Sequence, residues 1–177
     1  MHPCASYMRR VRRQQTCILG DMYCFGAGVA KNYEEAARWY QKAAEQGDAN
    51  AQCTLGDIYL KGESVTQNYE KAARWCQKAA EQGNAYAQCT LGDMYHNGEG
   101  VMQDYSEAEK WYRKAAEQRY SPAQYSLGLM YYHGEGVAVN YAEAEKWLRR
   151  ADAQRFPGAE EVLSKIFRKR RRKKWSL

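Results

Sequence analysis

The chain has 177 residues, 45% of them hydrophobic and 27% charged, so it can bury a core of useful size and a single domain is expected. Its net charge of +6 is unevenly distributed, because the first 13 and the last 13 residues hold 12 of the 27 basic residues and no acid, whereas residues 14–164 hold 15 basic and 21 acidic residues. No run of about 18 apolar residues could span a bilayer, and residues 1–15 lack the apolar stretch of a secretory signal, so we expect a cytoplasmic protein.

From residue 15 to residue 158 the sequence repeats with a period of 36 residues. The string Leu-Gly-x-x-Tyr and a tryptophan both recur at this step. The strings begin at Leu19, Leu55, Leu91 and Leu127, and the tryptophans are Trp39, Trp75, Trp111 and Trp147. A fixed period of this length indicates stacked structural units, which we place at 15–50, 51–86, 87–122 and 123–158. Residues 1–14 break this register at Pro3 and Cys4 and form an atypical basic segment.

Each unit is expected to contain two amphipathic helices. In the second unit, apolar residues recur at helical spacing from Ala51 to Tyr59 and again from Tyr69 onwards. Gly62 stands where the first helix would end, and Asn68 stands where an N-cap would begin the second. In the other three units, a glutamate three residues after the N-cap predicts a capping box. These glutamates are Glu35, Glu107 and Glu143.

The predicted fold is all-α, a right-handed α/α superhelix (solenoid) of four 36-residue helical hairpins plus a C-terminal capping helix. One hairpin alone leaves an apolar face bare, whereas stacked hairpins bury these faces against one another. After the fourth unit, Ala159, Leu163 and Phe167 continue the first-helix pattern. Residues 159–177 are therefore expected to form the capping helix and a basic tail.

The pattern A-x-x-x-L-G-x-x-Y-x-x-G-x-G-V, followed by x-x-x-Y-x-x-A-x-x-W-x-x-K-A-A, resembles the Sel1-like repeat, a relative of the tetratricopeptide repeat. The resemblance covers roughly four fifths of the chain. It implies a non-catalytic adaptor or scaffold that assembles protein complexes, and it names no partner.

Two turns between hairpins depart from the repeat. Arg119 and Arg155 replace the helix-ending Gly47 and Gly83, and a proline follows each arginine nearby. We therefore expect the last two turns to differ in shape from the first two.

A helical projection of the first helix of a unit separates Cys53, Asp57 and Leu60 from the side that packs within the hairpin. In tetratricopeptide-like solenoids the corresponding side lines the concave groove, so the resemblance implies a partner-binding surface there. The predicted groove residues are Asp21, Cys53, Asp57, Cys89, Asp93, His96, Tyr125, Leu129 and Tyr132.

The predicted groove is acidic in the first three units and more aromatic in the fourth, where Tyr125 and Leu129 break their rows. Its expected ligand is an extended or helical peptide that carries basic residues and an apolar anchor. Two plainer explanations remain open. The aspartates are solvated charges copied by duplication, and Tyr132 takes part in ordinary packing between helices.

The cysteines and histidines predict neither a metal site nor a cofactor. His96 and His133 fall near loops without a second ligand at zinc spacing, and no C-x-x-C is present. Cys89 and His96 lie seven residues apart on one helix, but no orienting acid is implied, so a non-catalytic protein is expected. In a cysteine-rich branch of the family, paired cysteines tie each unit together, one of them near the end of the second helix. This chain has alanine there, at Ala44, Ala80 and Ala116.

An unbroken run of seven cations lies near the C-terminus. It consists of Arg168, Lys169, Arg170, Arg171, Arg172, Lys173 and Lys174. Four roles remain open for this basic tail: delivery to the nucleus or a host cell, binding of nucleic acid, binding of an anionic membrane, and a solvated end. A tail folded back onto the acidic body of its own or a neighbouring molecule is a variant of the last.

Overall fold

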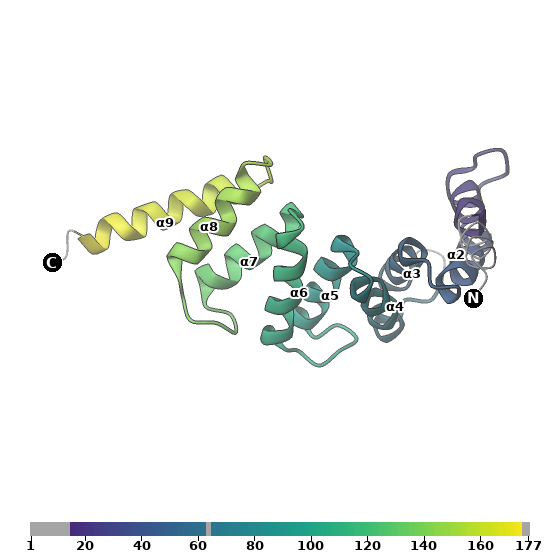
Figure 1. Ribbon diagram of the computed structural model, residues 1–177, viewed down its shortest axis with the longest axis horizontal. Helices are drawn as coiled ribbons and strands as arrows, with labels where there is room; N and C mark the ends of the chain where they lie inside the picture. The colour runs from purple at the N-terminus through teal and green to yellow at the C-terminus, as the bar shows by residue number, and fades with distance from the viewer. Residues whose placement is uncertain (1–14, 63–64, 175–177) are drawn as a thin grey trace, which may run out of the picture. The chain divides into compact units, whose positions relative to one another are not determined.

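The computed structural model describes residues 15–62 and 65–174, with only the backbone of residues 172–174. All regular elements in these ranges are helices, so the all-α prediction is confirmed (Figure 1). Residues 15–25 are helical at the start of the described part. The helices that follow are α2 (Tyr33–Glu45), α3 (Ala49–Lys61), α4 (Tyr69–Glu81), α5 (Ala85–Asn97), α6 (Tyr105–Glu117), α7 (Ser121–His133), α8 (Tyr141–Asp152) and α9 (Ala159–Lys174). The prediction for residues 1–14 lies outside the described residues.

The paired helices of the 36-residue repeat are confirmed. The first helices α3, α5 and α7 begin at Ala49, Ala85 and Ser121, two residues before the unit boundaries drawn from the sequence. Small residues allow the two helices of a hairpin to approach closely. A Cβ added at Gly56 in α3 would lie only 2.5 Å from Sγ of Cys76 in α4.

The second helices begin with side-chain caps, but the capping boxes are only half formed. The side chain of Asn32 accepts hydrogen bonds from the backbone N–H groups of Glu34 and Glu35, and Asp104 and Asn140 accept in the same way. The N-cap's own backbone N–H does not bond to the glutamate. Instead it donates to the carbonyl of the repeated tyrosine in the preceding helix, as Asn32 does to Tyr23 over 2.9 Å. This bond closes the loop, and the glutamate side chains pair with nearby basic residues.

The expectation that the last two turns differ in shape was wrong for the turn at Arg119 but holds for the last turn. There α9 begins four residues after Arg155, whereas α3, α5 and α7 begin two residues after Gly47, Gly83 and Arg119, and Gly158 has a φ of 83°. Arg119 and Arg155 adopt left-handed backbone conformations, with φ angles of 65° and 58°, where Gly47 and Gly83 have 87° and 90°. The hydrogen bonds that end the preceding helices are the same in all four turns: the N–H of residue 47, 83, 119 or 155 donates to the carbonyl three residues back. The backbone hydrogen bonds of the turn therefore accompany a conformation of Arg119 and Arg155 that costs a side chain roughly 1–2 kcal/mol.

The chain divides into two compact units, and α5 contributes residues to both. Unit 1 contains residues 1–87 and 99–101, and unit 2 contains residues 88–98 and 102–177. In unit 1, α3 packs against α2 and α4, and the core includes Tyr40 and Leu55.

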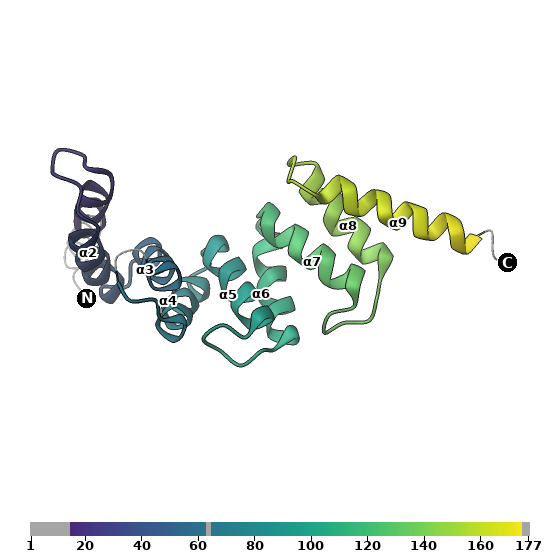
Figure 2. The ribbon, with the colours of Figure 1, turned by 180° about the vertical axis from the view of Figure 1, so that it is seen from behind.

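In unit 2, α7 packs against α6 and α8, and α8 packs against α9. Figure 2 shows α9 running alongside α8. Leu148 of α8 and Val162, Leu163 and Ile166 of α9 share one apolar cluster, so the predicted C-terminal helix is present and buries one face. No helix in the described ranges is long and apolar enough to cross a membrane.

Candidate functional site

The predicted aspartates accept hydrogen bonds from tyrosines. Tyr40 in α2 donates to Asp21 over 2.7 Å, and Tyr112 in α6 donates to Asp93 over 2.6 Å at the same separation of 19 residues. Both tyrosines are buried. Burial and the neighbouring carboxylate raise the pKa of each tyrosine hydroxyl, so the hydroxyls keep their protons and act as donors.

In the second and fourth repeats, another residue stands at the position of the tyrosine that donates to the aspartate. At the position of Tyr40, the second repeat has Cys76, and Asp57 there accepts a hydrogen bond from Tyr86 over 2.8 Å. The fourth repeat has Leu148 at this position, and the aspartate is replaced by Leu129, which packs against the cluster that contains Leu148. The change to Leu129 therefore accompanies the loss of a tyrosine hydroxyl.

Three predicted groove residues, Asp93, His96 and Leu129, line a hollow of about 300 Å³ in unit 2. We call it the α5–α7 hollow. It is formed by the end of α5, Tyr112 of α6, one side of α7 and the loop that follows α7. Its complete lining is Asp93, His96, Asn97, Tyr112, Ser126, Leu129, Met130, His133 and Glu135. The hollow thus combines two carboxylates with an apolar wall.

His96 lies at the rim of this hollow between two polar partners. Its Nε2 is 3.0 Å from Oε2 of Glu135, and its Nδ1 is 3.0 Å from Oδ1 of Asn97. Burial alone would lower the pKa of His96, but the hydrogen bonds to Glu135 and Asn97 and the charges of Glu135 and Asp93 outweigh it, so the pKa is raised. Sequence reasoning missed Glu135, because it lies on a loop outside the helical rows.

Unit 1 has a smaller hollow of about 170 Å³ at corresponding repeat positions. Cys24, Tyr40, Asp57 and Lys61 line it, and these positions are equivalent to His96, Tyr112, Leu129 and His133 in unit 2. The two hollows have different chemistry, because the smaller one lacks the histidines and has Lys61 at its edge.

The predicted groove cysteines belong to the packed interior. Cys53 and Cys89 are only 8% and 5% exposed. Burial, with the charge of Asp57 as a smaller cause, raises the pKa of Cys53 to about 12, and burial also raises that of Cys89. The cysteines of the described ranges, Cys17, Cys24, Cys53, Cys76 and Cys89, are free thiols. The described residues contain no group of three or more His, Cys, Asp or Glu that could hold a metal ion.

Tyr125 and Tyr132 contact elements at the C-terminal end of unit 2. The ring of Tyr125 lies 5.0 Å from that of Phe156. The ring of Tyr132 lies 5.8 Å from that of Tyr141, and Nζ of Lys169 lies 4.4 Å from the centre of the Tyr132 ring. A lysine of the basic tail therefore covers part of the aromatic surface predicted for a partner.

The basic tail continues α9 as a helix to Lys174. Arg170 pairs with Glu145 of α8 over 2.5 Å, and Lys169 contacts Tyr132 and Tyr141. Arg168 and Arg171 are exposed. The side chains of the remaining tail residues lie outside the described part.

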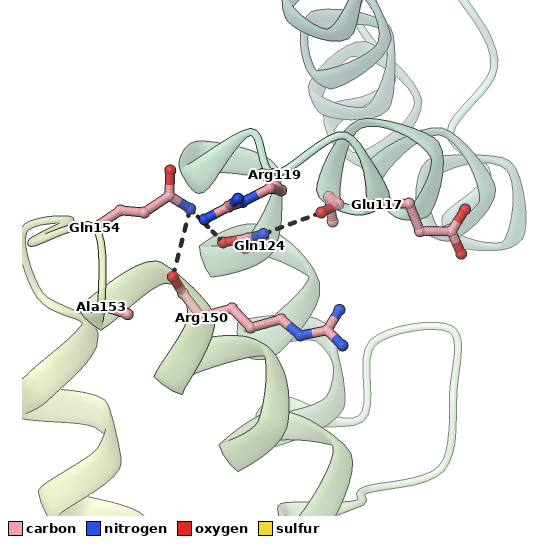
Figure 3. A pocket seen from close by; sticks show the side chains of 7 residues that line it. Glu117, Arg119, Gln124, Arg150, Ala153 and Gln154 are labelled. Atoms are coloured by element: carbon pink, nitrogen blue, oxygen red, sulfur yellow. Dashed lines mark hydrogen bonds between the residues drawn. The ribbon is translucent and has the colours of Figure 1, made fainter.

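A second hollow in unit 2 contains a repeated hydrogen-bond ladder that sequence reasoning missed (Figure 3). Nε2 of Gln124 donates to the carbonyl of Ala116 over 3.0 Å, and Nε2 of Gln154 donates to Oε1 of Gln124 over 2.8 Å. Gln52 and Gln82 form the corresponding bonds in unit 1, with Ala44 as the carbonyl acceptor. The 36-residue recurrence of these glutamines could have revealed them, and it marks this hollow as part of the repeat architecture.

These hairpins, with their loop-closing bonds and glutamine ladders, define a tetratricopeptide-like α/α repeat protein. The sequence model of the Sel1 repeat matches residues 17–48, 49–84, 85–120 and 121–151. The chain therefore belongs to the Sel1 repeat family, as its resemblance implied. Proteins of this family are typically protein-interaction scaffolds and are generally non-catalytic.

Solved structures with the same fold include a protective antigen of uropathogenic Escherichia coli strains that displays an SLR fold. This antigen is 35% identical in sequence to the chain, with a TM-score of 0.85. The match covers 89% of this chain and 34% of the antigen. A Sel1 repeat protein from Oxalobacter formigenes is 35% identical with a TM-score of 0.80, covering 86% and 62%. Cysteine rich protein B of Helicobacter pylori is 27% identical with a TM-score of 0.59, covering 75% and 96%.

The chain thus spans about a third of the length of the first of these proteins and less than two thirds of the second. No match was found among curated proteins.

Proposed function

We propose that the chain is a non-catalytic protein-binding scaffold that holds a peptide segment of its partner along the first helices of the repeats. The α5–α7 hollow carries this proposal, because it brings Asp93, His96 and Leu129 together around one open space. These residues come from two neighbouring repeats, as a surface built by stacking requires.

The chemistry of the hollow favours a lysine or arginine side chain in the partner. The carboxylates of Asp93 and Glu135 attract a cation, while Leu129 and Met130 offer an apolar wall to its aliphatic stem. The partner that fits is a peptide with a basic residue beside an apolar anchor.

The hollows support a narrower binding surface than the full set of predicted groove residues. Asp93, His96 and Leu129 line the α5–α7 hollow, and Asp57 lines the hollow of unit 1. Cys53 and Cys89 are buried. We therefore assign partner contacts to the hollows and packing to the cysteines, Tyr125 and Tyr132.

A random peptide library selected against the whole chain tests the proposal. The enriched peptides are expected to contain lysine or arginine next to an apolar residue. Glu135→Lys should weaken their binding at least about tenfold, since it places a like charge in the hollow. The control Glu117→Lys makes the same charge change in the other hollow of unit 2 and should leave binding intact.

If Glu135→Lys retained the same peptides with the same affinity, the assignment to this hollow would be wrong. If no peptide or only acidic peptides were enriched, the proposed partner chemistry would also fail.

The pH dependence of binding provides a further test of the site. Protonation of His96 adds a positive charge beside Glu135, so a cationic peptide should bind more weakly near pH 6 than near pH 8. In isothermal titration calorimetry, His96→Gln should remove most of this dependence. A dependence that survived in His96→Gln would have another source.

A further inference from the structure

The final helix presents its cations in two directions. The helical rise and turn place Arg168 and Arg171 on one side of α9, and Ile166 and Arg170 on the other. Ile166 is fully buried, and Arg170 pairs with Glu145 of α8. Lys169 is held above the rings of Tyr132 and Tyr141. These contacts fix the orientation of α9 against the rest of unit 2.

The cations on the outer side are available to a partner. Arg168 and Arg171 are exposed, and neither makes an ion pair with another residue that the structure describes. The helix backbone continues through Arg172, Lys173 and Lys174. In both ribbon views this end of α9 extends past α8 (Figures 1 and 2). The basic tail is therefore a preformed helix that projects from its support.

The burial of the apolar face favours a phosphate polyanion over a membrane. An interfacial membrane helix inserts its apolar face between the lipids. In α9 that face contains Val162, Leu163 and Ile166, which are at most 7% exposed and pack against α8. Phe167 is 40% exposed, but the guanidinium of Arg149 lies 5.6 Å from its ring centre. Arginine also matches phosphate oxygens with paired hydrogen bonds.

We propose that the outer side of α9 binds double-stranded nucleic acid through its phosphates. A duplex carries about one negative charge per 1.7 Å, so closely spaced cations release many counterions when they contact it. Residues 14–164 hold 15 basic and 21 acidic residues, so the body of the chain repels the duplex and the contact is confined to the end of α9. Binding is independent of base sequence, because phosphates carry no base information.

Fluorescence anisotropy with a labelled 20-base-pair DNA duplex tests this proposal on the full chain. The logarithm of the association constant should fall linearly with the logarithm of salt concentration, by about 0.9 for each phosphate contacted. Arg168→Gln with Arg171→Gln should lower the magnitude of this slope by about two and weaken binding at least about tenfold at low salt.

The matched control is Arg74→Gln with Lys114→Gln, which removes the same charge from exposed positions on α4 and α6. It should leave both the slope and the affinity unchanged. Circular dichroism should show equal helicity in both double variants, so that a loss of binding reports contacts and not unfolding.

Three results would overturn the proposal. The first is a wild-type chain that does not bind the duplex. The second is an equal loss of binding in the two double variants. The third is binding to vesicles containing phosphatidylserine without binding to the duplex, which would assign α9 to a membrane surface.

Discussion

At the scale of single residues, Asp21 was predicted to line the groove, and in the structure it is the hydrogen-bond acceptor of Tyr40. The hydroxyl of Tyr40 donates to Asp21, and the rest of the Tyr40 side chain is buried. A buried hydroxyl without an acceptor is unfavourable. In the fourth repeat, where leucine replaces the tyrosine, Leu129 replaces the aspartate. The second repeat keeps Asp57 although Cys76 replaces the tyrosine, and there Tyr86 donates to the aspartate instead. The aspartate is therefore present wherever a tyrosine hydroxyl donates to it.

This pairing predicts a positive coupling between the two residues in a double-mutant cycle. Asp21→Leu should destabilise the chain by about 1–3 kcal/mol, because the Tyr40 hydroxyl loses its acceptor. Asp21→Leu combined with Tyr40→Leu, which reproduces the pair of the fourth repeat, should cost less than the sum of the single changes by about 1 kcal/mol. Urea unfolding measures these free energies. The unpaired combination Asp21→Leu with Tyr112→Leu should be additive, and equal additivity in both cycles would refute the coupling.

The left-handed Arg119 predicts a stabilising substitution. Arg119→Gly removes the strain of a side chain at a φ of 65°, while it also adds conformational freedom to the unfolded chain. The net effect should be a stabilisation of up to about 1 kcal/mol in urea unfolding. Arg74→Gly, in the middle of α4, should instead destabilise by about 1 kcal/mol, since it only lowers helix propensity. Destabilisation by both substitutions would mean that Arg119 makes contacts that outweigh its strain.

At the scale of elements, a glutamine near the start of a first helix joins that helix to the turn before it. Gln124 is 2% exposed and bonds both to the carbonyl of Ala116 at the end of α6 and to Gln154 after α8. The ladder therefore connects successive hairpins through a buried glutamine side chain. Hydrophobic periodicity does not detect such a contact, because a glutamine in a helix is expected to face solvent.

Gln124→Ala is expected to destabilise the chain by about 1–3 kcal/mol, because it leaves the carbonyl of Ala116 without its donor in a buried place. Gln154→Ala should cost about 1 kcal/mol or less, since this side chain is exposed and water can replace the bond. Thermal or urea unfolding measures both values. A smaller effect at Gln124 than at Gln154 would contradict a structural role for the ladder.

At the scale of the whole molecule, the free energy of unfolding should be a sum of contributions from single repeats and from the contacts between neighbouring repeats, because in repeat proteins each repeat contacts only the next. The C-terminal end of unit 2 depends on α9, because Ile166 is fully buried in the cluster that contains Leu148. The helix of residues 15–25 buries less of its apolar surface, since Ile18 is 49% exposed.

Ile166→Ala should therefore destabilise unit 2 by about 2–4 kcal/mol. Amide hydrogen exchange should accelerate in α8 and α9 and stay nearly unchanged in α2 and α3, because the lost contacts are local. Ile18→Ala should have a small effect everywhere. Uniform acceleration across all helices after Ile166→Ala would show that the chain unfolds as one cooperative unit instead.

The sequence by itself determined the helices, their pairing and the repeat family. The 36-residue period, the helical spacing of apolar residues and the N-cap asparagines are local signals, and local hydrogen bonding and burial of one helix face follow from them directly. The same spacing also placed Asp93, His96 and Leu129 on one side of their helices, and these three line the α5–α7 hollow.

Only the tertiary structure decided which of these side chains remain open to a partner. Cys53 and Cys89 share a helical face with the aspartates, yet neighbouring helices bury them, and Lys169 covers Tyr132 from a different element. Glu135 enters the hollow from the loop after α7 and lies beside His96. Each outcome depends on contacts between residues far apart in the chain, whereas a periodic pattern describes only one helix at a time.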